Sequence, residues 1–223
     1  MQRDLKKDVL EILEEPVEFF KLSSEEAAMV GYYISEKNPA FCERIPGGWR
    51  IYISKDLNTI QQAEVAAHEL AHLLLKGEGL YSVSLGEDWP ESYLAMEINN
   101  VISHHFIITR LKKDYGIGSN LHISLRESIL TNGQQMIEEY SEEYVMLHGI
   151  GLHLLDLFLT AKKHKKRIEE LLELSDKVKE SFEIGEKLLV YPSHQISAEE
   201  QWLRISEFLQ RLGYDIDNAR LCW

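Results

Sequence analysis

The segment from Ala66 to Leu75, AAHELAHLLL, places two histidines and a glutamate inside a stretch that is otherwise apolar. Alanine and leucine favour a helix, and Gly77 stands where such a helix would end. On a helix, His68 and His72 lie on one face, one turn apart, so their rings can converge on one ion. Buried histidines and a buried carboxylate without partners would be costly, whereas metal binding compensates them. The segment therefore predicts a buried, metal-binding helix.

Within this segment, residues 68–72 have the pattern H-E-x-x-H, with Glu69 directly after the first histidine. In this position a carboxylate can accept a proton from water that the metal activates, which is the role of a general base. The alternative is an ordinary core helix whose histidines are satisfied by neighbouring protein groups. The apolar flanks favour the metal, and two imidazoles with a third protein ligand and one open position fit a single zinc ion per chain.

The third ligand is expected on a downstream helix that opens near Asp88 and runs to about Lys113. This segment offers two glutamates, of which Glu91 is better explained as the capping partner of Asp88. Glu97 lies well inside the helix among apolar residues, where an inward-pointing ligand would sit. The sequence therefore predicts Glu97 as the third ligand.

His104 lies two turns beyond Glu97 on a similar helix face and complicates this assignment. It could replace Glu97 as ligand or act as a donor to the transition state, although an ordinary helix histidine is the more common case. Asn100, near Glu97 on the helix, could orient a metal ligand through a hydrogen bond without binding the metal itself.

One strand and many helices define the expected fold class. Residues 47–54, GGWRIYIS, alternate apolar and polar side chains after a glycine pair, which is typical of a half-buried strand. From Leu121 onward the apolar residues recur at helical spacing, and no further strand is evident. We expect a mainly α protein with a small β-sheet (α+β), divided into a core of residues 1–118 and a helical extension of residues 119–223.

Composition excludes several classes of partner. The formal net charge of -13 argues against nucleic acid and anionic membranes, which require clustered basic residues. The basic run at 162–167, KKHKKR, is followed at once by acidic residues and predicts a solvated helix face. Residues 145–161 form the most apolar stretch, but His148, His153 and Asp156 interrupt it, so a buried helix is expected rather than a membrane span. With only two cysteines and no signal peptide, a cytoplasmic protein is predicted.

The strand at 47–54, the H-E-x-x-H helix and the later segment AMEINNVISHHFI together resemble the ImmA/IrrE-like metallopeptidases, which are compact gluzincins. The resemblance covers roughly residues 25–113. It implies that His68 and His72 are zinc ligands, that Glu69 is the general base and that Glu97 is the third ligand. It also implies a protein or peptide substrate, and a specific regulatory protein as the target. The helical second half is expected to contact a regulatory partner or select the substrate.

The expected activity is therefore that of a zinc-dependent endopeptidase, with the strand around residues 50–54 binding an extended substrate by strand addition. The alternative is a non-catalytic binding or sensor module whose metal site is structural or vestigial. A fourth protein ligand, His104 or His105, would favour this alternative, because it would close the position that a substrate needs. A third and less favoured hypothesis is a helical interaction protein without a metal.

Overall fold

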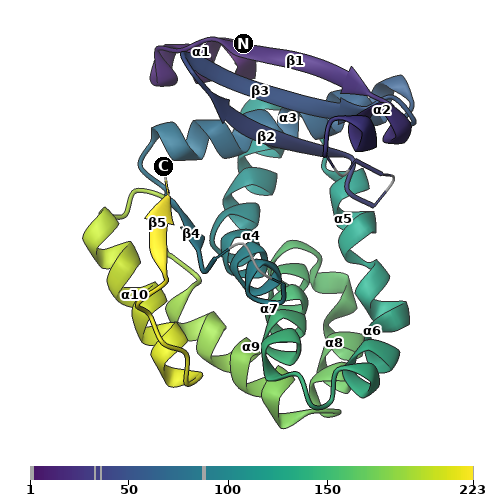
Figure 1. The fold of residues 1–223 in the computed structure, drawn as a ribbon, viewed down its shortest axis with the longest axis vertical. Coiled ribbons are helices and arrows are strands. Elements are labelled where there is room, and N and C mark those ends of the chain that lie inside the picture. The colour runs from purple at the N-terminus through teal and green to yellow at the C-terminus, as the bar shows by residue number, and fades with distance from the viewer. Residues whose placement is uncertain (1–2, 33, 36, 87–88, 223) are drawn as a thin grey trace. The chain divides into compact units, whose positions relative to one another are not determined.

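The computed structural model describes residues 3–32, 34–35, 37–86 and 89–222. The chain divides into two compact units, which are described separately (Figure 1). Unit 1 comprises Met1–Glu78 and Ile107–Leu125, and unit 2 comprises Gly79–Phe106 and Arg126–Trp223.

This division differs from the expected boundary at residue 118. The units interleave because the first part of helix α4 (Glu91–Arg110) packs with the second half of the chain. Within unit 2, for example, the ring of Tyr93 on α4 lies directly against Gly149. The chain consequently changes unit inside α4 and again near the end of helix α5 (Asn120–Arg126).

The sheet of unit 1 has three strands, β1 (Val17–Leu22), β2 (Ala40–Ile45) and β3 (Gly48–Ser54), in the order β1-β3-β2. β3 is parallel to β1 and antiparallel to β2. The strand predicted at residues 47–54 is therefore present, but it is the central strand and hydrogen-bonded on both sides. The expectation that a substrate adds to this strand is wrong, because the edges of the sheet belong to β1 and β2.

Helices in unit 1 are positioned by their caps and by the sheet. α1 (Leu5–Leu13) contacts α3 (Thr59–Gly77), and α3 in turn contacts β2 and β3. α3 ends at Gly77 as predicted, and its capping box is formed by Asn58 and Gln61. α2 (Ser24–Met29) has a capping box of Ser23 and Glu26. A π-helical turn, Leu111–Tyr115, continues α4.

Unit 2 is mainly helical. Besides the first part of α4, it contains α6 (Ser128–Glu139), α7 (Tyr144–Thr160), a 3-10 turn (Lys162–His164), α8 (Lys165–Leu172), α9 (Asp176–Leu188) and α10 (Ala198–Arg211). Two short antiparallel strands, β4 (Ser82–Ser84) and β5 (Arg220–Cys222), were not predicted. A three-residue strand is too short to show an alternating pattern. The prediction of a mainly α fold with a small β-sheet is confirmed.

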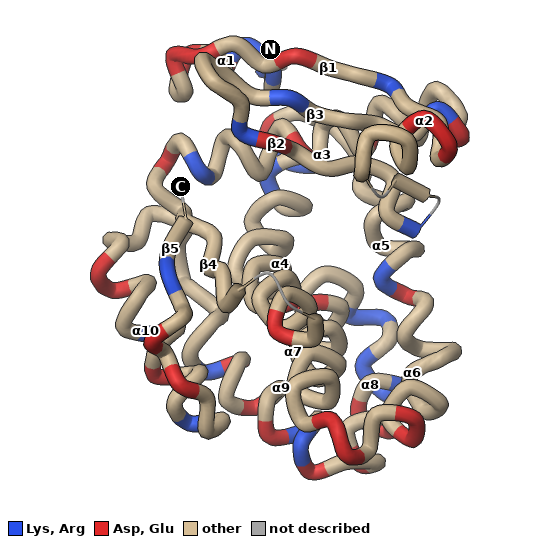
Figure 2. Tube along the Cα trace, in the orientation of Figure 1, with Lys and Arg blue, Asp and Glu red and all other residues tan. Residues whose placement is uncertain are grey.

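Charged residues of both signs are interspersed along the helices of unit 2 (Figure 2). The basic run at 162–167 takes part in ion pairs of this kind. Lys163 lies 2.8 Å from a carboxylate oxygen of Glu127, and Arg167 lies 3.1 Å from one of Glu170. These contacts agree with the interpretation of the run as a solvated helix face.

α7 is the most apolar helix of unit 2 and packs closely on α9. The contact depends on Gly151, where an added Cβ would lie 2.1 Å from the hydroxyl of Ser181 and 2.3 Å from the carbonyl oxygen of Val178. Among the described residues no single helix has the length and apolar character to cross a membrane. Only α7 and residues 162–172 together have that length and apolar character, and the two segments are bent by 119° relative to each other.

Replacing Gly151 with alanine is expected to lower the free energy of unfolding by about 1–3 kcal/mol, because the backbone of α9 blocks the new methyl group. The matched control is Gly133→Ala in α6, where the nearest atom is a methyl end of Leu171 at 3.2 Å. That side chain can move, and alanine favours the helix by up to about 1 kcal/mol. Urea unfolding of the two variants measures the difference; equal stabilities would contradict the close contact of α7 and α9.

Candidate metal centre

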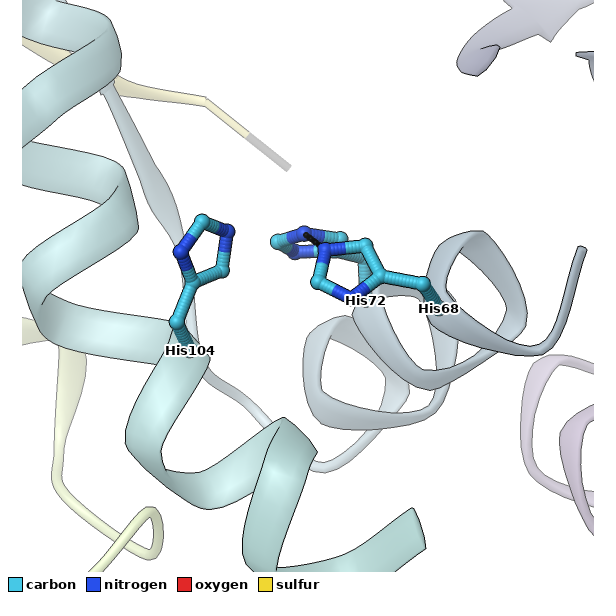
Figure 3. Close-up of side chains that lie close together, drawn as sticks. All are labelled: His68, His72 and His104. Atoms are coloured by element: carbon cyan, nitrogen blue, oxygen red, sulfur yellow. Dashed lines mark hydrogen bonds between the residues drawn. The ribbon is translucent and has the colours of Figure 1, made fainter. Parts of the chain in front are cut away.

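α3 places His68 and His72 on the same helix face (Figure 3). Their Nε2 atoms lie 3.1 Å apart, and the rings are inclined by 75°. His68 is 8% exposed and His72 is half-buried. Zinc–nitrogen bonds of about 2.0–2.1 Å in a tetrahedral site place two ligand nitrogens about 3.3 Å apart. The two imidazoles therefore have the chemistry and the spacing to share one divalent ion.

Glu69 follows His68 on α3 and is half-buried. Burial raises the pKa of its carboxyl group to about 7. The pKa of the Cys42 thiol is raised to about 12, mainly by the burial of Cys42 and to a lesser extent by the negative charge of Glu69. Cys42 lies on the edge strand β2, which α3 contacts within unit 1.

His122 is a further histidine of unit 1 and stacks on His68. The ring centroids are 4.3 Å apart and the rings are inclined by only 20°. This contact holds the plane of the His68 ring. Sequence reasoning gave His122 no role, because its position beside α3 depends on the path of the chain through α5 and not on any local pattern.

Glu97 lies in unit 2 and is fully buried. Its Oε1 and Oε2 accept hydrogen bonds from Nη1 and Nη2 of Arg126 at 2.9 and 2.5 Å. His153 Nδ1 lies 3.2 Å from Oε1, and Asn100 donates to Oε2 at 3.2 Å. Burial alone would raise the pKa of Glu97, but Arg126 and His153 outweigh it and lower the pKa to about 2. Asn100 thus contacts Glu97, and its role in orienting a metal ligand stays a prediction.

Asp156 continues this network inside unit 2. Its Oδ2 lies 2.7 Å from Nε of Arg126 and 3.2 Å from Nδ1 of His104. Asp156 and His104 are both buried, at 0% and 3% exposure. His104 is the third side chain labelled in Figure 3 and comes from α4. A continuous chain of polar contacts thus runs from Glu97 through Arg126 and Asp156 to His104.

The ion pair with Arg126 bears directly on the predicted role of Glu97. The contacts of both carboxylate oxygens with Arg126, together with those of His153 and Asn100, would compete with a metal ion for Glu97. Removing one partner of a buried pair generally costs about 3–5 kcal/mol, because the other charge stays buried. Glu97 as a metal ligand stays a prediction, in competition with this ion pair.

The remaining candidates on α4 are less informative. His105 Nδ1 lies 3.2 Å from the carbonyl oxygen of Val101 in its own helix, which is the arrangement of an ordinary helix histidine. The predicted capping pair of Asp88 and Glu91 cannot be compared, since Asp88 lies outside the described residues.

Sequence reasoning missed Arg126, Asp156 and His153 as members of the buried network. A signal was present for two of them, since Asp156 and His153 interrupt the most apolar stretch of the chain. A carboxylate in such a helix needs a cation or hydrogen-bond donors. No comparable signal marked Arg126, which stands in a polar segment, LRES, with the pattern of a surface helix.

Comparison with known proteins identifies one segment. Residues 15–115 match the family model of the IrrE N-terminal-like domain, a peptidase family. The match includes the whole sheet of unit 1, α3 and all of α4. No curated protein and no solved structure matches the chain. This similarity over residues 15–115 agrees with the resemblance to the ImmA/IrrE-like metallopeptidases.

Proposed function

We propose that the protein is a zinc-dependent endopeptidase in which His68 and His72 hold the ion and Glu69 is the general base. The observation that carries this proposal is the convergence of the two Nε2 atoms, 3.1 Å apart, beside a half-buried glutamate on α3. The similarity of residues 15–115 to the IrrE N-terminal-like domain, a peptidase family, supports a metallopeptidase scaffold. Two imidazoles favour zinc over calcium or magnesium, which prefer oxygen ligands.

The third protein ligand is proposed to come from α4, where the sequence offers Glu97 and, as the alternative, His104. Three protein ligands leave the fourth position open, as catalysis requires. The zinc ion, when bound, acts as a Lewis acid that polarises the scissile carbonyl and acidifies water.

Glu69 carries the proton transfers of the proposed reaction. Its carboxylate accepts a proton from the attacking water and then delivers it to the amine of the leaving peptide. His122 contributes by stacking on His68, which fixes the plane of one ligand ring. Ordered ligands lose less freedom when the ion binds, so this contact favours a metal site that is formed in advance.

A protein or peptide substrate is proposed to bind as an added strand. The contact of α3, which carries the base, with β2 supports this strand as the site, and β2 is an edge of its sheet. Edge strands present unpaired backbone groups that an extended peptide can bind. We propose a specific regulatory protein as the target, with unit 2 contributing to its selection, and the cytoplasm as the compartment.

A second candidate function is a non-catalytic binding or sensor module on the same scaffold. The observation that favours it is the ion pair of Glu97 with Arg126, which occupies the carboxylate expected to complete a catalytic site. A zinc ion closed by four protein ligands, or a protein that binds zinc without hydrolysing any peptide, would support this candidate.

Zinc content tests the two ligands on α3. Native protein is expected to hold about one zinc per chain, and His68→Ala and His72→Ala are expected to lose it, because a site with two remaining ligands binds weakly. Mass spectrometry of the purified variants measures the metal. The control is His164→Ala in unit 2, which contacts Glu127 and should retain zinc. Full zinc content in both α3 variants would refute the site.

Exchange of Glu69 for glutamine tests the base. Hydrolysis of a denatured protein such as casein should fall by about 10²–10⁴-fold, the usual contribution of general base catalysis. Zinc should remain bound, since Glu69 is not a ligand. The exposed Glu25→Gln on α2 serves as the matched control and should retain activity. Unchanged activity of Glu69→Gln would remove Glu69 from the mechanism.

A further inference from the structure

We propose that a groove between α8 and α9 binds a helical segment of a partner protein, in which a large apolar side chain stands one turn from basic residues. The groove has a volume of about 300 Å³, and all of the residues that line it belong to unit 2. The inference deepens the partner-selecting role proposed above for unit 2 and rests on it, but the binding itself requires no metal.

The groove forms because α8 and α9 each present one helix face to it. Residues 165–173, of α8 and its C-cap, and residues 179–186, of α9, line it at spacings of three and four, which place each set on a single face. α9 is held close to α7 at Gly185, where an added Cβ would lie 2.7 Å from a methyl carbon of Leu152. Phe158 of α7 also lines the groove, so three helices of one unit enclose it.

The floor of the groove is apolar. The rings of Phe158 and Phe182 meet edge to face, with their centroids 5.7 Å apart, and Ile168 and Leu172 are the apolar residues of α8 that line it. Phe158 is only half-buried, although it belongs to the most apolar helix of the unit. Covering apolar surface in a hollow of this kind favours binding of an apolar side chain, which would serve as the anchor of a partner.

The rim of the groove is acidic. Two lysines and four glutamates line it, which leaves a net charge of -2. Both lysines already have partners within the rim, since Lys179 lies 2.6 Å from a carboxylate oxygen of Glu173 and Lys165 lies 3.7 Å from one of Glu169. The two remaining carboxylates, on α9, therefore determine the charge that a partner meets.

These carboxylates belong to Glu183 and Glu186, which are both exposed. Neither makes an ion pair with any residue that the structure describes in unit 2. The pKa of Lys179 is raised mainly by its hydrogen bond to Glu173 and to a lesser extent by the charge of Glu183. Glu183 and Glu186 also lie in the last two turns of α9, where the helix dipole favours cations. A lysine or arginine of a partner would be attracted by both carboxylates and by the helix end.

The helical walls of the groove favour a helical partner segment over an extended one. The backbone groups of α8 and α9 are bonded within their own helices, so they offer an extended peptide no partners for its N–H and C=O groups. A helix satisfies its own backbone and needs only side-chain contacts, which is how amphipathic helices bind in apolar grooves. The shape and the charge of the groove thus specify a basic amphipathic helix.

Fluorescence anisotropy of a labelled helical peptide tests the proposal, with leucine on one face of the peptide and lysine on the other. It is added to zinc-free full-length protein, prepared with a chelator. We expect the peptide to bind, and the same peptide with glutamate in place of lysine to bind much more weakly. Glu183→Gln combined with Glu186→Gln should weaken binding by about 2–30-fold, because two exposed ion pairs are lost.

The matched control combines Glu139→Gln in α6 with Glu199→Gln in α10. It removes the same charge from two exposed positions that do not line the groove, and it should bind the peptide as the native protein does. Equal weakening by the two double variants would show attraction to the overall negative charge of the protein and would overturn the proposal.

Methyl NMR of the unmodified protein gives a second test that involves no variant. The methyl signals of Ile168 and Leu172 should shift when the peptide is added, whereas those of Val83, in β4, should not. Shifts of Ile168 and Leu172 that depend on protein concentration without peptide would assign the groove to a second copy of the chain and overturn the proposal.

The outcomes also separate this inference from the proposed endopeptidase. Peptide binding that occurs only in zinc-loaded protein would place the peptide at the metal site, which overturns the inference and supports that site. No binding to either form would overturn the inference and leave the zinc and hydrolysis tests unaffected. Equal binding by zinc-free and zinc-loaded protein, lost with the α9 carboxylates, is the result that the proposal predicts.

Discussion

The structure depends on how polar and charged side chains are satisfied where the surroundings are apolar. In unit 1 this concerns α3, whose leucines and alanines bury His68 and leave His72 half-buried. A buried imidazole is stable only with a partner, and the two Nε2 atoms converge so closely that one ion can satisfy both. The contacts of α3 with α1, β2 and β3 hold this helix, and the stack of His122 on His68 holds one of the rings.

The same constraint shapes unit 2 in a different way. Two carboxylates, Glu97 and Asp156, are fully buried there, and one guanidinium, Arg126, bridges them. Buried ion pairs contribute little net stability compared with apolar side chains, but breaking one is costly. Such a network therefore fixes the orientation of its side chains but adds little to the stability of the fold. His104 lies at the end of this network, with its Nδ1 3.2 Å from Oδ2 of Asp156.

The sequence was sufficient for features that local patterns determine. It predicted α3 and its end at Gly77, the strand at residues 47–54 and the helical second half. It did not predict the central position of β3, because pairing with β1 and β2 joins segments that are distant in the chain. For the same reason it missed Arg126, which comes to Glu97 from 29 residues away. The interleaving of the two units is likewise a product of tertiary packing.

The most direct test of the account is a crystal structure of the zinc-loaded protein with diffraction data collected on both sides of the zinc absorption edge. The account predicts one anomalous peak per chain within bonding distance, about 2.0–2.1 Å, of Nε2 of both His68 and His72. A peak bound elsewhere, or none in protein saturated with zinc, would contradict the claim that α3 is a metal-binding helix.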